Sequence, residues 1–85
     1  MLDKNSPTVK ALRFSTQCAR DALAASSVIA RKAPKKWETL AVQLRSLNAT
    51  RVTAYNAFLK YGTPYDRDVL THAEAAWSSF VKEHT

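Results

Sequence analysis

The sequence has little glycine, proline and cysteine, and each shortage excludes a class of protein. Its 85 residues include one glycine, three prolines and one cysteine. So few turn-forming residues argue against a collagen-like chain and against a β-sandwich with its many tight turns. A single cysteine excludes an internal disulfide and favours a reducing, cytoplasmic compartment. No apolar run approaches the roughly 20 residues that a membrane-spanning helix needs.

The sequence also lacks the groupings on which enzymes and metal sites depend. One glycine is too few for a Gly-rich phosphate-binding loop. Cys18, His72 and His84 do not supply the three or four closely spaced ligands of a zinc site. Asp66 and Asp68 point apart on a helix, so they form no general acid–base pair. We therefore expect a protein that is not an enzyme, with no cofactor, no metal ion and no small-molecule substrate.

The residues that are present predict a single helical domain over residues 1–85. Hydrophobic side chains make up 46% of the chain, which is a globular composition. Ser6 followed by proline, and Thr63 followed by proline, are typical of helix starts, and Gly62 is a typical helix end. Pro34 is expected to open a second helix after a break in the pattern. The expected helices cover residues 8–32, 34–61 and 64–83.

Apolar side chains recur every three or four residues in all three segments, as they do on the buried face of a helix. In the second segment this face consists of Trp37, Leu40, Leu44, Leu47, Arg51, Ala54, Phe58 and Tyr61. In the third it consists of Val69, Leu70, Ala73, Ala76, Trp77 and Phe80. The first segment has two such rows: Val9, Leu12, Thr16, Ala19, Leu23, Ser26 and Ala30, and beside them Ala11, Phe14, Cys18, Ala22, Ala25 and Ile29.

These patterns predict an all-α fold, a small antiparallel three-helix bundle. The connections between the segments are short, and short connections make consecutive helices antiparallel neighbours. Two apolar rows on the first helix imply contact from two sides. We expect the second of these rows to be available for a homodimer.

The chain carries a net charge of +6, and all of the excess lies near its beginning. Residues 1–36 hold eight basic and two acidic side chains, whereas residues 37–85 hold five of each. The basic residues line one edge of the first helix and the corner that follows it: Lys10, Arg13, Arg20, Arg31, Lys32, Lys35 and Lys36. Lys35 and Lys36 sit at the positive end of the next helix dipole, a local cost that favours a use elsewhere. The simpler alternative is a solvated face.

Arg51 interrupts the apolar row of the second helix and needs an acidic partner, because burial of an unpaired guanidinium is very costly. If the second and third helices fold back about Gly62, position 51 lies opposite about position 75. Glu74 is then the expected partner in a structural ion pair, with Asp21 as the second choice.

The outer face of the second helix is small and almost uncharged, which is unusual for an exposed helix. Small side chains let another backbone approach closely, so this face is a candidate for protein contact or self-association. An unremarkable surface is the alternative. The face consists of Val42, Ser46, Ala49, Thr53 and Ala57.

Together these features predict a non-enzymatic interaction protein: a small regulator, inhibitor or accessory subunit. It would dock its basic helical surface on another macromolecule, with an acidic protein surface as the first choice of partner. The alternative is a nucleic-acid-binding protein of weak sequence selectivity, in which the same basic side chains contact phosphates. Residues 8–36 also have the composition of an organellar transit peptide, so an organellar location stays open beside the cytoplasmic one.

Overall fold

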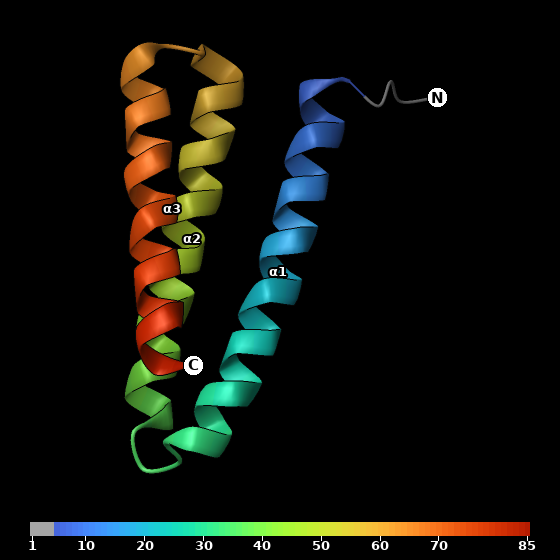
Figure 1. The fold of residues 1–85 in the computed structure, drawn as a ribbon. Helices are drawn as coiled ribbons and strands as arrows, with labels where there is room; N and C mark the ends of the chain where they lie inside the picture. The colour runs from blue at the N-terminus through green and yellow to red at the C-terminus, as the bar shows by residue number, and fades with distance from the viewer. Residues whose placement is uncertain (1–4) are drawn as a thin grey trace.

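Three α-helices account for most of the protein in a computed structural model that describes residues 5–85. Helix α1 spans Pro7–Lys32, α2 spans Trp37–Tyr61 and α3 spans Pro64–His84, and the described part of the chain contains no strand. Consecutive helices run antiparallel (Figure 1). The all-α, three-helix bundle expected from the periodicity is confirmed.

Local hydrogen bonds explain where α1 and α3 begin and where α2 ends. The Ser6 side chain accepts a hydrogen bond from the backbone N–H of Val9 at 3.2 Å. Thr63 likewise accepts one from the N–H of Asp66 at 3.1 Å. Each cap satisfies one of the backbone donors that the first turn of a helix leaves unpaired. At the end of α2, Gly62 adopts φ +64°, a left-handed conformation that glycine reaches without steric cost.

The start of α2 differs from the expectation by three residues. Pro34 was expected to open the helix, but residues 34–36 form a turn and the helix begins at Trp37. The N–H of Lys36 donates to the Ala33 carbonyl oxygen at 3.1 Å, which closes that turn. Because proline suits the first residues of a turn as well as those of a helix, its presence alone does not distinguish the two.

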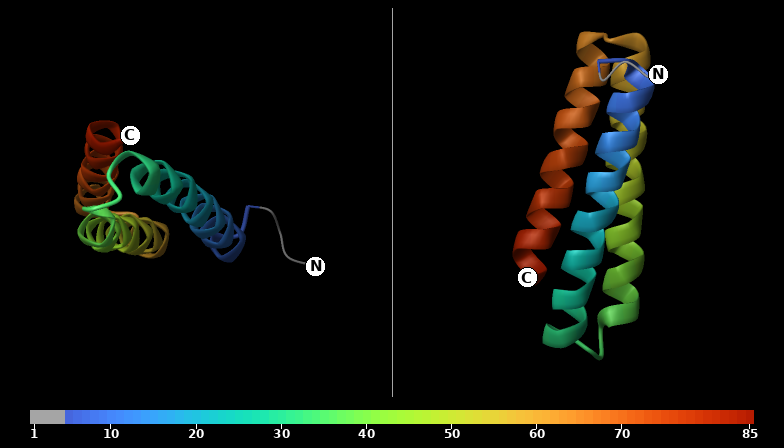
Figure 2. Two further views of the ribbon diagram at one scale, coloured as in Figure 1. Left: turned by 90° about the horizontal axis from the view of Figure 1, so that it is seen from below. Right: turned by 90° about the vertical axis from the view of Figure 1, so that its right-hand side faces the viewer.

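The bundle is closed at the α1–α2 corner and opens toward the other end. Helices α1 and α3 each pack along α2 but contact each other little. In Figures 1 and 2, the N-terminal half of α1 leans away from α3. The buried core lies near the corner and consists of Ala25, Ile29, Leu40, Leu44 and Trp77. At the open end α1 rests on α2, where the rings of Phe14 and Tyr55 stack with centroids 4.0 Å apart.

The two apolar rows of α1 have different positions from those expected. The row with Cys18, Ala25 and Ile29, which was expected to serve a homodimer, is the row that enters the core. The middle of the other row, residues 12 to 23, faces solvent, and its two leucines, Leu12 and Leu23, are 58% and 71% exposed. Small side chains on the inner row allow α1 to approach α2 closely, whereas the two large leucines lie outside this contact.

Candidate functional site

Arg51 is buried, and its guanidinium contacts side chains or backbone from all three helices. Its Nε–H donates to the Asn48 side-chain oxygen at 2.9 Å, and Nη2 donates to the Cys18 carbonyl oxygen at 3.4 Å. The guanidinium lies 3.9 Å from the ring centroid of Trp77, within cation–π range. Its ion-pair partner is Asp21, at 3.8 Å. These contacts place Arg51 in a structural role between α1, α2 and α3.

The expected ion pair between Arg51 and Glu74 is therefore replaced by the second choice, Asp21. The helical period explains the difference. Ala73 and Trp77 are the residues of α3 that turn inward, and Glu74 is rotated off this buried face into solvent. The fold-back about Gly62 does place the expected region of α3 opposite Arg51, but the side chain that faces the guanidinium is the ring of Trp77.

Cys18 has the properties of a buried, unreactive thiol. It is 2% exposed and free of any disulfide. Burial raises the pKa of the Cys18 thiol, and the nearby Arg51 guanidinium offsets part of that rise. The thiolate that nucleophilic or metal-binding chemistry requires is thus disfavoured at neutral pH.

The part of the basic row that lies along α1 is exposed and forms no ion pair within residues 5–85. Lys10, Arg13 and Arg20 lie on the solvent side of α1, and none of them forms an ion pair with any residue of 5–85. The nearest acid on α1, Asp21, accepts a hydrogen bond from Gln17 at 2.9 Å and pairs with Arg51. Its charge is therefore balanced from the interior, and the row keeps its positive charge.

The remaining residues of the basic row lie at the corner between α1 and α2. Arg31, Lys35 and Lys36 are exposed and form no ion pair within the described chain. Lys32 differs, because its ammonium donates a hydrogen bond to the backbone carbonyl oxygen of Thr85 at the end of α3. Arg31 lies eleven residues after Arg20, a rise of roughly 16 Å along α1, so the charges form two groups: one along α1, and one at the end of α1 and in the turn that follows it.

Leu12 belongs to this surface, although the sequence alone assigned it to an apolar row. It lines a shallow hollow on the outside of α1 together with Arg13, Thr16, Gln17 and Arg20. An exposed leucine in the same hollow as two arginines makes this surface both cationic and apolar. The only signal in the sequence was the presence of two apolar rows on α1, one of which had to lie outside the core.

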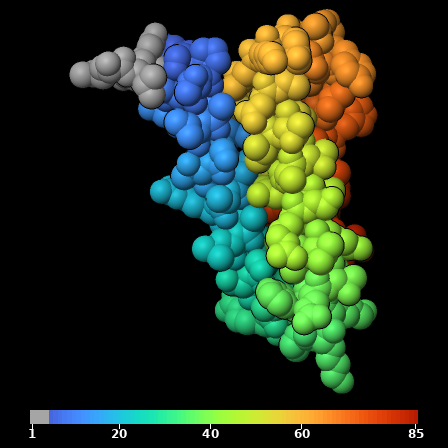
Figure 3. Space-filling view, turned by 180° about the vertical axis from the view of Figure 1, so that it is seen from behind, coloured from blue at the N-terminus to red at the C-terminus, as the bar shows by residue number. Residues whose placement is uncertain are grey.

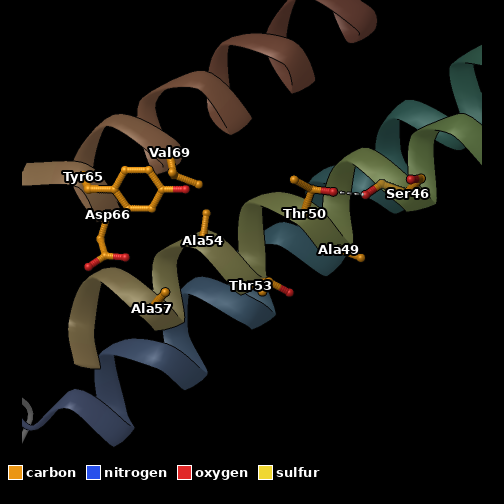
Figure 4. A pocket seen from close by; sticks show the side chains of 9 residues that line it. All are labelled: Ser46, Ala49, Thr50, Thr53, Ala54, Ala57, Tyr65, Asp66 and Val69. Atoms are coloured by element: carbon orange, nitrogen blue, oxygen red, sulfur yellow. Dashed lines mark hydrogen bonds between the residues drawn. The ribbon is translucent and has the colours of Figure 1, made fainter. Parts of the chain in front are cut away.

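Most of the small outer face of α2 lies in a hollow between α2 and α3 (Figure 4). Ser46, Ala49, Thr53 and Ala57 line its α2 side, and Tyr65, Asp66 and Val69 line its α3 side. The nearby Thr50 hydroxyl donates to the Ser46 carbonyl oxygen at 2.9 Å, so it is satisfied within α2. Val42, the fifth residue of the predicted face, lies outside this hollow and borders two others, one shared with α1 and one shared with Ser46 and with Phe80 of α3.

The two histidines have contacts within α3. His72 Nδ1–H donates to the Asp68 carbonyl oxygen at 2.7 Å, and the His84 ring lies 4.5 Å from the Phe80 ring, centroid to centroid. Over residues 5–85, no three His, Cys, Asp or Glu side chains are grouped as metal ligands.

No protein-family model, curated protein or solved structure matches this chain. Among the helices of residues 5–85, none combines the length and the apolar character that a membrane crossing requires. The exposed charged and apolar side chains described above are therefore the observations from which a function is proposed.

Proposed function

We propose that this protein is a non-enzymatic interaction module that docks the outer face of α1 on an acidic protein surface. The observation that supports this proposal is that Leu12, Arg13 and Arg20 line one exposed hollow. We call these three residues the α1 docking surface. Its arginines are free of ion pairs within the described chain, and Leu12 is 58% exposed.

The combination of charge and apolar area favours a protein partner over nucleic acid. On a phosphate backbone the arginines would find partners, but Leu12 would face phosphates and sugars without gain. On a protein, carboxylates can pair with the guanidiniums while an apolar side chain covers Leu12. The arginines would then steer the encounter, and Leu12 would contribute short-range contact.

The test is a pair of titrations followed by fluorescence anisotropy at about 50 and 200 mM salt. One probe is a helical peptide with a leucine row flanked by glutamates, called here the acidic peptide, and the other is duplex DNA. We expect the protein to bind the acidic peptide, and Leu12→Ser to weaken that binding about fivefold, equivalent to about 1 kcal/mol. Arg20→Ser should weaken it as well and reduce its dependence on salt.

Val42→Ser is the matched control, because Val42 is as exposed as Leu12 but lies on α2, in a hollow that Arg13 and Arg20 do not line. It should leave peptide binding unchanged. The proposal is contradicted by the following combined result. The protein prefers duplex DNA to the acidic peptide, Leu12→Ser does not change peptide binding, and removal of each cation weakens binding to all DNA sequences alike. That result would establish the nucleic-acid alternative.

A further inference from the structure

Figure 3 shows α1 and α2 running side by side. A second exposed apolar patch lies at a hollow between these two helices. Leu23 from α1 and Val42 from α2 are 71% and 58% exposed, and both border one hollow between the two helices. Ala19 and Ala41 line the same hollow, so a second molecule can approach the backbone closely. Such an exposed combination of large and small apolar side chains is typical of a contact surface.

Two opposite charges flank this patch on α2. Glu38 and Arg45 border the same hollow, and Val42 lies between them along the helix. They are seven residues apart, which is two helical turns or roughly 10 Å. Neither side chain forms an ion pair with another residue of 5–85. The patch thus carries one unpaired charge of each sign, on either side of an apolar centre.

This arrangement is complementary to itself. In a twofold dimer with the two α2 helices antiparallel, the contact is isologous, so each residue pairing occurs twice. With the axis near Val42, Glu38 lies opposite Arg45 of the partner subunit, and Arg45 lies opposite Glu38 of the partner subunit. Leu23 and Val42 then meet apolar side chains near the axis. We propose that two copies of this chain associate through the patch of Leu23, Glu38, Val42 and Arg45, called here the α1–α2 patch.

The charge pattern favours a second copy over a foreign partner as the occupant. A single copy supplies both the acid and the base that its twin needs, four residues before and three residues after Val42. The net charge of +6 on each copy opposes association at long range. At about 150 mM salt the Debye length is only about 8 Å, so the paired charges at contact act while the distant repulsion is screened.

The first test is the mass of the protein in solution, measured by sedimentation equilibrium at about 150 mM salt. The monomer has a mass of 9.5 kDa, and we expect this value to double with rising concentration. Leu23→Asp places a charge at the apolar centre and should return the protein to the monomer. Leu12→Asp, the same substitution at another exposed leucine of α1, should leave the dimer intact.

The second test reverses the charges. Either Glu38→Arg or Arg45→Glu alone places like charges opposite each other at both charge pairs of the dimer. Each variant should raise the dissociation constant of the dimer about tenfold. The double variant Glu38→Arg/Arg45→Glu restores opposite charges and should restore the dimer, which also shows that the variants fold. A mass of 9.5 kDa at every concentration would overturn the proposal, and so would a dimer that ignores Leu23→Asp and both single reversals.

Discussion

At the scale of the residue, Arg51 connects parts of the molecule that otherwise touch little. Helices α1 and α3 have few contacts with each other, yet one guanidinium reaches the Cys18 carbonyl oxygen on α1 and the Trp77 ring on α3. Its ion pair with Asp21 is long, at 3.8 Å, and the Asp21 side chain is 43% exposed. The buried hydrogen bonds and the ring contact therefore matter more for stability than this ion pair does.

Substitution of Arg51 should be costly, and substitution of its acidic partner should not. We expect Arg51→Ala to lower the free energy of unfolding by about 2–4 kcal/mol, because it removes buried contacts with three helices and leaves a cavity beside Trp77. Asp21→Asn should cost less than about 1 kcal/mol, since the pair is partly solvated. Urea denaturation measures both values.

The control for this comparison is Arg51→Met, which keeps much of the side-chain volume but has no guanidinium. Its free energy of unfolding should lie between those of the wild type and Arg51→Ala if both packing and polar contacts contribute. Equal, small effects of Arg51→Ala and Asp21→Asn would contradict the connecting role of Arg51.

At the scale of the element, local chemistry explains which helix boundaries the sequence predicts well. Ser6, Gly62 and Thr63 act within their own turns, and the ends of α1 and α3 lie within one residue of the expected positions. Pro34 fits a turn and a helix start equally, so the beginning of α2 was predicted three residues too early. The choice of row on α1 depends on how the helices pack, which periodicity alone does not determine.

The end of α2 depends on the left-handed conformation of Gly62. A Cβ atom added there would have the Phe58 carbonyl oxygen as its nearest neighbour, at 3.9 Å, so there is space for a side chain. The expected cost of Gly62→Ala, about 1 kcal/mol, therefore comes from the backbone conformation at φ +64° rather than from a clash. Gly62→Asn should cost less, because asparagine tolerates this region better. Thermal unfolding followed by circular dichroism compares the stability of the two variants with that of the wild type. A Gly62→Ala variant as stable as the wild type would contradict a conformational cost at this position.

At the scale of the whole molecule, the bundle presents two different surfaces on α1. One is the α1 docking surface, where Leu12, Arg13 and Arg20 line one hollow. The other is the α1–α2 patch, which includes Leu23 and the exposed flank of α2. The sequence predicted the basic row and the small face of α2, but it placed both leucines in the same apolar row of α1 without distinguishing their surroundings. Which neighbours surround an exposed leucine depends on how α1 packs on α2.

The most direct test of the proposed function is an NMR titration of the isotopically labelled protein with the acidic peptide. Backbone amide shifts report which surface the peptide covers. The account predicts that the largest changes occur from Leu12 to Arg20 along α1, with little change at Val42 on α2. Changes confined to the corner at residues 31–36, or centred on Val42, would contradict docking through the outer face of α1.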